Sequence, residues 1–368
     1  MDLLVFMKTA QETRKKSLPK AAGSSSLINQ KYFANHYFQT LSSIKQDLAQ
    51  FFFSEKEAYK KFESVLVPGI LFFEVTNICN SRCIFCAYKT VTHKKGTMPF
   101  STFKKATDEF VQMGGNTISF TPTAGEPLLD PDLINKIQYA VNCPGIKEVY
   151  FFTNGISLTQ GDLYRQLVDS GIKEIAISTA GCSQKSFKEV YGVDVYPKLI
   201  EGIYQLLKYN NEKEEPVKIS INFRPSQQLK DILESPDFKK YIQPYLSTRV
   251  RIEFLVNYDN WGGTIKKENL KGVMKLRRIP MVKNVPCTRT FDLMVLFDGS
   301  VRLCASRFKT TEFDDLVVGN VNEKSLSEIY YGKKVLQIRE GFLSHSLPSA
   351  CKDCSLYLPA TKKWLLQR

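Results

Sequence analysis

The sequence is poor in histidine and has no long apolar segment. Its 368 residues include three histidines, which argues against a histidine-rich metal site or a set of histidine general bases. No stretch approaches the ~18 consecutive apolar residues that a membrane span needs. The short apolar run at the N-terminus precedes the basic residues, the reverse of a secretory signal. We therefore expect a cytoplasmic protein with no membrane partner.

Acidic residues are also scarce relative to basic ones. The chain has 51 Lys and Arg against 37 Asp and Glu, a formal charge of +14. A balance this basic favours an anionic partner, such as nucleic acid, an acidic peptide or a phosphorylated metabolite. Nucleic acid is the least expected of these, because neither a reading helix nor basic residues interleaved with exposed aromatic residues stand out.

Nine cysteines are the most informative count. A secreted disulfide framework is short and dense in cysteine, and this chain is neither. Tight clustering in a chain without a secretory signal instead indicates metal ligation in a reducing cytoplasm. The cysteines form two clusters and two single residues: Cys79, Cys83 and Cys86; Cys287, Cys304, Cys351 and Cys354; and Cys143 and Cys182.

The first 68 residues show helical rather than strand periodicity. Between Tyr32 and Phe52 the apolar residues recur with a period of ~3.6, which predicts an amphipathic helix. The basic stretch upstream of this helix predicts a solvated tail. We expect residues 1–68 to form a basic, helical N-terminal extension.

From Gly69 onward, short β-branched or aromatic runs alternate with helical patterns, which predicts right-handed βα units on a parallel sheet. Six units are too few for a complete eight-stranded barrel, so we expect an α/β fold, a partial (β/α)6 TIM-like barrel over residues 69–265. Asp130 and Pro131 are expected to cap and open the helix after the second strand. The predicted strands are Ile70–Val75, Thr117–Thr121, Glu148–Phe152, Glu174–Ser178, Val217–Phe223 and Val250–Val256.

The alternation fades after residue 265. Trp261-Gly262-Gly263 is expected to form a packed corner between two domains, while Arg251, Glu253 and Asn257 on the sixth strand and its exit are candidates to line a substrate cavity. Asp298-Gly299 between two apolar runs predicts a hairpin turn, and residues 326–336 have a helical pattern. Residues 266–368 are therefore expected to form a small α+β domain that carries the second cysteine cluster.

Cys79, Cys83 and Cys86 form a C-x3-C-x2-C motif directly after the first predicted strand. Thiolates are the usual ligands of iron–sulfur clusters, and three of them in one loop can hold one face of a [4Fe–4S] cluster. No fourth cysteine stands at this spacing, so one iron would stay open to an external ligand. A structural zinc site, which needs a fourth protein ligand, is the alternative if a distant cysteine joins the three.

This motif at this position resembles the hallmark of the radical S-adenosylmethionine (radical SAM) superfamily. The resemblance implies that Cys79, Cys83 and Cys86 hold a [4Fe–4S] cluster whose open iron binds the amino and carboxylate groups of SAM. It further implies reductive cleavage of SAM to methionine and a 5′-deoxyadenosyl radical, which abstracts a hydrogen atom from a substrate. An external electron donor such as flavodoxin or ferredoxin is then an expected partner.

The segment Gly125-Glu126-Pro127 follows the second predicted strand and is similar to the G-E-P segment of this family. In the family this segment contacts the SAM amino group. Glycine lets the backbone approach a ligand closely, and carbonyl groups together with a carboxylate suit an ammonium group. The preceding Ala124 departs from the Gly-Gly of many members.

Other residues match the SAM site of the family by position. Asn154 and Ser178 stand at the ends of the third and fourth strands, where the resemblance places polar groups around the SAM ribose and carboxylate. Arg224, past the fifth strand, is expected to pair with that carboxylate through its planar guanidinium. Phe85 and Tyr88, on either side of the last cysteine, correspond to adenine-side positions.

Cys287, Cys304, Cys351 and Cys354 can ligate one cluster completely, which leaves no open iron and suits electron transfer. This region resembles the auxiliary-cluster domains of radical SAM enzymes called twitch and SPASM. A complete SPASM domain has further cysteines, so the shorter twitch type, with one auxiliary [4Fe–4S] cluster, is the better match. A four-cysteine zinc knob has the same ligand types and stays open as an alternative.

Two cysteines lie outside both clusters. Cys143, at the end of a predicted helix, is interpreted as a small apolar packing residue. Cys182 follows the fourth strand at the functional end of the barrel. A thiol there can donate a hydrogen atom to a substrate radical, as in related radical SAM epimerases; packing is the simpler interpretation.

The predicted function is thus that of a radical SAM enzyme, an oxidoreductase or a peptide-modifying enzyme. An auxiliary cluster that accepts an electron makes the net reaction oxidative, whereas a donor at Cys182 makes it an epimerisation. The basic charge and helical extension favour a ribosomally synthesised precursor peptide as the substrate. The alternatives are a small sugar, aminocyclitol or nucleotide-sugar metabolite and, from other classes, a non-enzymatic iron–sulfur electron carrier or a zinc-containing nucleic-acid-binding protein.

Overall fold

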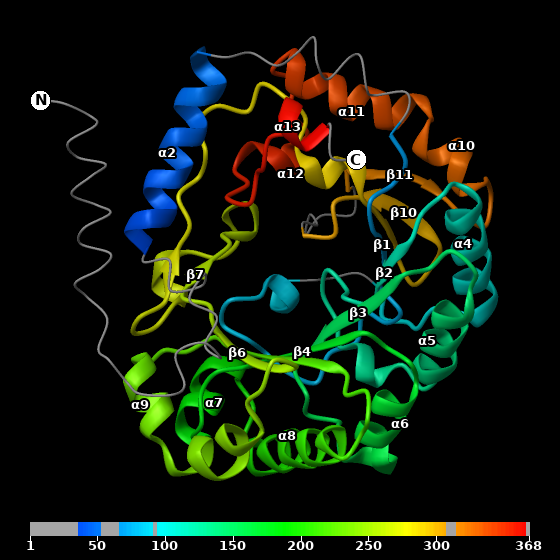
Figure 1. Ribbon diagram of the computed structural model, residues 1–368. Coiled ribbons are helices and arrows are strands. Elements are labelled where there is room, and N and C mark those ends of the chain that lie inside the picture. Colours follow the sequence, from blue (N-terminus) through cyan, green and yellow to red (C-terminus); the bar gives the residue numbers. More distant parts are fainter. Residues whose placement is uncertain (1–35, 53–65, 91–93, 307–313, 366–368) are drawn as a thin grey trace, which may run out of the picture.

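The computed structural model describes residues 36–52, 66–90, 94–306 and 314–365 (Figure 1). The basic tail predicted upstream of Tyr32 lies outside the described residues. The predicted N-terminal helix is confirmed where it is described, as α2 (His36–Phe52). Within these ranges, every helix is too short or too polar to cross a membrane.

One nine-stranded sheet, in the order β11-β10-β9-β1-β2-β3-β4-β5-β6, organises the fold. The first six strands pair in parallel, each beside the next in the chain, and the sheet curves with helices on its outer side (Figure 1). The predicted α/β partial barrel is confirmed. These strands are β1 (Leu71–Phe73), β2 (Thr117–Ser119), β3 (Glu148–Thr153), β4 (Glu174–Thr179), β5 (Lys218–Phe223) and β6 (Val250–Phe254).

The outer helices bury the apolar stripes that the sequence shows. In α4, Phe103, Ala106 and Phe110 recur at helical spacing and have no exposed surface. The ring of Phe103 packs on Phe73 of β1 with 4.7 Å between centroids, and burying such a side chain stabilises the fold by about 1.5–3 kcal/mol. The barrel helices are α4 (Phe100–Gln112), α5 (Leu133–Asn142), α6 (Leu163–Asp169), α7 (Gln184–Tyr191), α8 (Tyr196–Asn211) and α9 (Leu229–Glu234).

The predicted start of α5 is wrong by two residues. The helix begins at Leu133, and Asp130 does not cap it. The Asp130 carboxylate instead lies 2.7 Å from the Lys136 ammonium, and neither side chain has any exposed surface. The other carboxylate oxygen accepts a hydrogen bond of 3.0 Å from the backbone N–H of Asp132, the residue at the N-cap position, so Asp130 balances a buried lysine and supports the turn before the helix.

The second cysteine region extends the same sheet. β9 (Leu293–Val295) pairs in parallel with β1, and β10 (Ser300–Leu303) returns antiparallel to β9 as the predicted hairpin. β11 (Val317–Asn320) then pairs with β10. The C-terminal residues thus share a sheet with the barrel, and the domain boundary near residue 265 stays a prediction. Two short strands, β7 (Asn257–Tyr258) and β8 (Lys275–Leu276), pair separately.

The helix predicted over residues 326–336 is two helices, α10 (Leu326–Tyr330) and α11 (Lys333–Leu343). The break is at Gly332, which is extended in conformation. A Cβ atom at this glycine would lie 2.7 Å from the carbonyl oxygen of Glu328, so only glycine fits the junction. Two further short helices, α12 (Ser349–Lys352) and α13 (Lys362–Leu365), complete the chain.

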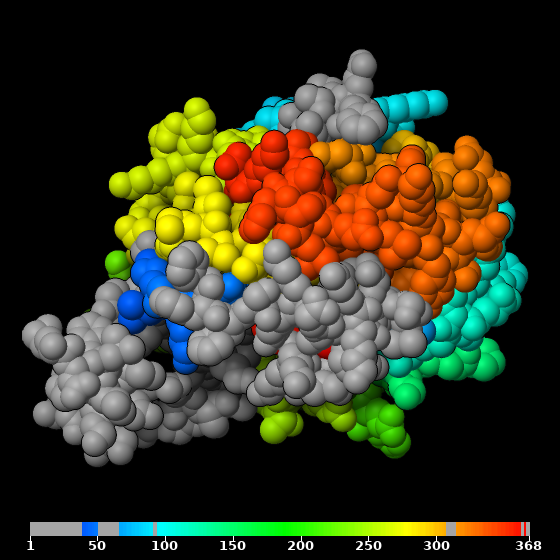
Figure 2. All heavy atoms as spheres, turned by 90° about the horizontal axis from the view of Figure 1, so that it is seen from above, coloured from blue at the N-terminus to red at the C-terminus, as the bar shows by residue number. Residues whose placement is uncertain are grey.

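Helix α2 packs on the segment that leads into the second cysteine region. The Asp47 carboxylate pairs with Arg278 at 2.6 Å and accepts hydrogen bonds from the backbone N–H groups of Met281 and Val282. Gln50 accepts a hydrogen bond of 2.7 Å from the Tyr357 hydroxyl. Figure 2 shows parts of α2 (blue) beside the segment in yellow, which in turn adjoins the C-terminal residues in red. The described part of the N-terminal extension therefore stabilises this region through contacts distant in sequence.

Candidate functional site

The first cysteine cluster lies in the loop after β1, at the carboxyl end of the parallel strands. The Ser81 hydroxyl lies 3.3 Å from the Cys79 sulfur and 3.4 Å from the Cys83 sulfur. The backbone N–H of Tyr88 donates to the Cys86 sulfur at 3.4 Å. The loop thus brings three thiols together and supplies hydrogen-bond donors to their sulfur atoms.

Burial penalises the charged form of these three thiols unless a positive partner is present. Burial raises the pKa of Cys79 and raises that of Cys86 to about 11. The pKa of Cys83 rises well above its ordinary value because of burial and the neighbouring Cys86. Ligation deprotonates thiols, and buried thiolates need a positive partner, which the iron of a cluster supplies. A donor set of three sulfurs therefore fits a cluster with one iron left open.

Glu126 ties the neighbouring loops together. Its carboxylate accepts hydrogen bonds from the backbone N–H of Asn154 (2.7 Å), the Thr153 hydroxyl (2.5 Å) and the backbone N–H of Leu128 (3.1 Å). Its own N–H donates to the carbonyl oxygen of Ile78, next to the cysteine motif, at 2.8 Å. Burial raises the pKa of Glu126 to about 7, against the lowering effect of the hydrogen bonds. The residue fixes the loops after β1, β2 and β3 to one another.

The backbone conformation and close packing at Gly125 require a glycine in this segment. Its φ is +149°, and a Cβ atom there would lie 2.3 Å from the carbonyl oxygen of Thr76. The segment therefore packs backbone to backbone against the end of β1. Pro127 follows as the first residue of a short 3-10 turn (Pro127–Leu129) that Glu126 caps.

We predict that Glu126→Gln loosens this junction. At about pH 8 the amide places an N–H₂ group against one of three donors. We expect this mismatch to outweigh the charge-burial cost that the amide relieves, so that the free energy of unfolding falls by about 1–3 kcal/mol. Anaerobic denaturant unfolding measures this change. Glu148→Gln, an exposed position at the start of β3, is the matched control and should change it by less than about 0.5 kcal/mol. Equal stability of the two variants would contradict the role of Glu126.

Arg224, Ser178 and Phe85 lie together, as the sequence predicts for a SAM site. The Arg224 Nε donates to the Ser178 hydroxyl at 2.7 Å, and the guanidinium lies 5.0 Å from the centre of the Phe85 ring. The Phe85 ring lies between those of Tyr191 (5.6 Å) and Tyr258 (5.3 Å). The positive charge of Arg224 also lowers the pKa of Cys83 and Cys86, although burial has the larger effect. Arg224 and the rings of Phe85, Tyr191 and Tyr258 thus form a cationic and aromatic wall beside the three thiols.

Tyr191 is the residue of this wall that sequence reasoning missed. Its hydroxyl shares a hydrogen bond of 2.8 Å with that of Ser178. Tyr191 lies at the end of α7 and stacks on Phe187 with 4.7 Å between ring centres. In the sequence it reads as one more apolar residue of a helix, and no local motif distinguishes it from the core.

Asn154 and Tyr88 also contact the cysteine loop. The Asn154 side-chain amide donates to the Asn80 side chain at 2.7 Å and lies 4.0 Å from the Cys79 sulfur. The Tyr88 hydroxyl accepts a hydrogen bond of 3.0 Å from the backbone N–H of Cys79. Both residues therefore support the loop; their contacts with SAM stay predictions.

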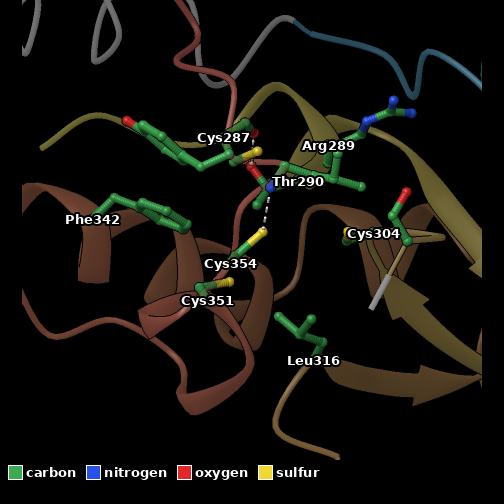
Figure 3. Close-up of a pocket in the computed structure, with 11 residues that line it drawn as sticks. Cys287, Arg289, Thr290, Cys304, Leu316, Phe342, Cys351 and Cys354 are labelled. Carbon is green, nitrogen blue, oxygen red and sulfur yellow. Dashed lines mark hydrogen bonds between the residues drawn. The ribbon is translucent and has the colours of Figure 1, made fainter. Parts of the chain in front are cut away.

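The second cysteine cluster surrounds one pocket (Figure 3). Cys287 precedes a 3-10 turn, Cys304 follows β10, Cys351 lies in α12 and Cys354 lies just beyond it. Burial raises the pKa of Cys304 to about 11 and that of Cys287 to about 12. The remaining lining of the pocket is largely apolar and includes Leu316, Phe342, Leu356 and Tyr357.

The donor chemistry of this pocket fits an iron–sulfur cluster. Four thiols face it, and backbone N–H groups donate to two sulfurs, from Leu356 to Cys354 (3.3 Å) and from Leu358 to Cys287 (3.4 Å). Cys304 has a left-handed φ of 68°, and the Arg302 guanidinium donates to its carbonyl oxygen at 2.9 Å. Among the described residues, no three Cys, His, Asp or Glu side chains lie close enough to chelate a single ion.

A short segment connects the two cysteine sites. The Trp261 indole N–H donates to the carbonyl oxygen of Phe85 at 2.9 Å, one residue before Cys86. The Asn260 side chain donates to the carbonyl oxygen of Asp353 at 2.8 Å, one residue before Cys354. Trp261 has a left-handed φ of 49°, which is rare for a bulky residue. The predicted segment therefore contacts both ligand loops; that it is a corner between two domains stays a prediction.

The two single cysteines lie elsewhere. Cys143 caps the end of α5 and is partly exposed. Cys182 is 4% exposed, and burial raises its pKa to about 12, opposed by a hydrogen bond with Ser235. The thiol is therefore protonated at neutral pH, as a hydrogen-atom donor must be, but its donor role stays a prediction.

Two family profiles match the chain. The profile of the radical SAM superfamily matches residues 73–238, and that of the SPASM iron–sulfur cluster-binding domain matches residues 287–355. The first match covers the cysteine loop and the wall around Arg224, and the second covers all four cysteines of the other pocket.

Curated relatives share part of the barrel. A probable GTP 3′,8-cyclase of Sulfurisphaera tokodaii is 30% identical over 134 residues, which are 36% of this chain and 41% of the relative. A GTP 3′,8-cyclase of Clostridium acetobutylicum is 31% identical over 148 residues, 40% of this chain and 44% of the relative. The chain therefore spans less than half the length of these two relatives.

Solved structures share the fold over most of the chain. Streptococcus suis SuiB bound to precursor peptide SuiA matches with a TM-score of 0.57 and 14% identity, over 96% of this chain and 83% of that one. BtrN in complex with AdoMet and 2-DOIA matches with a TM-score of 0.52 and 17% identity, over 80% of this chain and 96% of that one. The two cysteine motifs and the two family profiles agree: the chain contains a radical SAM domain, followed by a C-terminal SPASM-type iron–sulfur cluster-binding domain.

Proposed function

We propose that this radical SAM enzyme oxidises a precursor peptide at an unactivated C–H bond. Its cofactors are SAM and two [4Fe–4S] clusters. When bound, SAM and the first cluster supply a hydrogen-abstracting radical, and the second cluster supplies an electron acceptor. The observation that carries this proposal is a three-thiol loop at the carboxyl end of the barrel strands, connected through Asn260 and Trp261 to a pocket with four thiols.

Each site has residues suited to its cofactor. We assign the SAM-binding cluster to Cys79, Cys83 and Cys86, and the auxiliary cluster to the four cysteines of the pocket in Figure 3. Arg224 presents a guanidinium to the SAM carboxylate, held in orientation by Ser178. Glu126 acts through the loops that it joins and positions the backbone of the G-E-P segment for the SAM ammonium. Reduced thiols at both sites suit a reducing compartment such as the cytoplasm.

A peptide substrate has two lines of support. The formal charge of +14 suits an acidic partner. The structure of SuiB, which is described with a precursor peptide, matches 96% of this chain. An oxidative outcome is supported by the four-thiol pocket, because fully ligated clusters suit electron transfer. A flavodoxin or ferredoxin is the proposed external electron donor.

A small polar metabolite is the second candidate substrate. BtrN, described with 2-DOIA, matches over 96% of its own length, and the curated relatives are named for a reaction of GTP. Such a metabolite, if phosphorylated or nucleotide-linked, also suits a basic protein.

Anaerobic reconstitution tests the proposed chemistry and the substrate class. The reconstituted protein should bind about eight iron atoms per chain. Its incubation with SAM and a reductant should release 5′-deoxyadenosine. Acidic precursor peptides and sugar or nucleotide-sugar metabolites are then compared as substrates. A peptide that loses two mass units supports the first candidate, while turnover of a metabolite only supports the second. No 5′-deoxyadenosine with fully loaded protein would contradict both.

The role of Cys182 has its own test. We predict that Cys182→Ala keeps turnover within about tenfold, because the oxidative reaction needs no hydrogen donor and the change costs mainly packing, about 1 kcal/mol. Product mass and configuration measure the outcome. Cys143→Ala is the matched control at the other single cysteine. A loss of product while 5′-deoxyadenosine formation continues would instead make Cys182 a donor and the reaction an epimerisation.

A further inference from the structure

Lys283 is a buried cation beside the four-thiol pocket. Only 6% of the surface of Lys283 is exposed. The ammonium donates to the carbonyl oxygens of Cys351 (2.8 Å) and Lys352 (2.6 Å). Neighbouring residues are anchored to α2: Val282 N–H donates to Asp47 at 3.0 Å, and the Asn284 side chain donates to the carbonyl oxygen of Gln50 at 2.8 Å. The fold therefore holds this lysine in place from both sides.

The described hydrogen-bond partners of the Lys283 ammonium are uncharged. In the described part of the chain, both hydrogen-bond acceptors of the ammonium are carbonyl oxygens, and no carboxylate pairs with it. Burial lowers the pKa of Lys283, while the charges of Cys354, Cys351, Asp353 and Cys287 raise it. An unpaired buried charge is costly. The nearby negative charges are those of Asp353 and, once ionised, of the pocket cysteines.

A second buried cation next to the pocket gives a useful contrast. Arg302 has no exposed surface and donates to the carbonyl oxygen of Cys304 at 2.9 Å. Its guanidinium, however, lies 3.0 Å from the carboxylate of Asp314. Arg302 is therefore paired with a carboxylate, although its charge, like that of the pocket-lining Arg289, also lowers the pKa of Cys304. Lys283 differs from Arg302 because its ammonium is held by carbonyl oxygens of the segment that carries Cys351.

We propose that Lys283 is the counter-cation of the auxiliary cluster and makes that cluster easier to reduce. This inference rests on the proposed assignment of the four cysteines as ligands. Reduction adds one negative charge to a cluster, and a fixed positive charge in a low-dielectric surrounding stabilises the reduced form more than the oxidised form. A cluster tuned in this way accepts an electron more readily, as an oxidative reaction requires.

The test is a redox titration of the auxiliary cluster alone. A full-length Cys79→Ala, Cys83→Ala, Cys86→Ala background removes the other cluster and should retain about four iron atoms per chain. In this background, Lys283→Met should shift the midpoint potential to a more negative value, and Lys283→Arg should leave it close to that of the background protein. Lys352→Met is the matched control, since Lys352 is an exposed lysine next to Cys351, and solvent should screen its loss.

The possible results distinguish the inference about Lys283 from the assignment of the four cysteines as cluster ligands. Equal midpoint potentials for Lys283→Met and the background protein would overturn the inference. If Lys283→Met binds no iron, iron retention replaces the potential as the readout: retention by Lys283→Arg supports the inference, and loss in both variants overturns it. Absence of iron, or zinc in its place, in the background protein would instead overturn the ligand assignment.

Discussion

Replacing Cys79, Cys83 and Cys86 with alanine is expected to abolish SAM cleavage. Without these thiols no cluster can form in the loop after β1, so 5′-deoxyadenosine formation should fall more than about 100-fold. Iron should fall from about eight to about four atoms per chain, because the four-thiol pocket remains. Anaerobic reconstitution, iron analysis and quantification of 5′-deoxyadenosine measure these effects.

The matched control for this variant is Cys143→Ala. Cys143 is a partly exposed thiol at the end of α5, outside both sites. This control should keep its iron and its rate of SAM cleavage. Cleavage of SAM by the triple variant at the rate of the unmodified enzyme would contradict the assignment of the first cluster.

The second large effect is expected at the other pocket. Replacing Cys351 and Cys354 with alanine removes two of four ligands and should also lower iron to about four atoms per chain. Cleavage of SAM should persist within about tenfold, because the first loop is intact, whereas formation of oxidised product should fall more than about 100-fold. The triple variant and the double variant thus separate radical generation from oxidation.

Product analysis decides the outcome of this second experiment. Oxidised product at an undiminished rate, with half of the iron lost, would show that the auxiliary cluster is not the electron acceptor. An equal loss of SAM cleavage would show that the pocket supports the first site structurally. Such structural support would run through two neighbouring residues. Trp261 contacts the cysteine loop of the first site, and Asn260 contacts that of the second.

Local sequence patterns were sufficient for the barrel and the hairpin. Several of the parallel strands are buried on both faces; all three residues of β1 and five of the six residues of β5 are buried. The turn at Gly299 has a φ of +86°, as its Asp-Gly sequence predicts. In both cases the deciding interactions are close in sequence, so the pattern carries the information.

Details that depend on distant residues were not predictable in this way. Asp130 reads as a helix cap, but a buried lysine recruits its carboxylate. Gly332 lies inside the helical pattern of residues 326–336, but it is the N-cap of α11 and separates that helix from α10. The position of α2 depends on contacts such as that of Asp47 with Arg278, 231 residues away. Tertiary competition, rather than local preference, decides these features.

The same distinction applies to the candidate site. The cysteine motifs and the G-E-P segment carry their spacing in the sequence, and the structure brings them together. Tyr191 and Lys283 carry no motif, and their relevance comes from hydrogen bonds across the fold. A lysine 68 positions from Cys351 has no local feature that distinguishes it from the other basic residues of a chain with a charge of +14.

Electron paramagnetic resonance of the reduced first cluster tests the account most directly. A Cys351→Ala, Cys354→Ala variant, reconstituted and reduced without oxygen, should give the signal of this cluster alone. Addition of SAM should change its g values, because an iron without a protein ligand gains an amino and a carboxylate ligand. A spectrum that stays unchanged at saturating SAM would contradict the account.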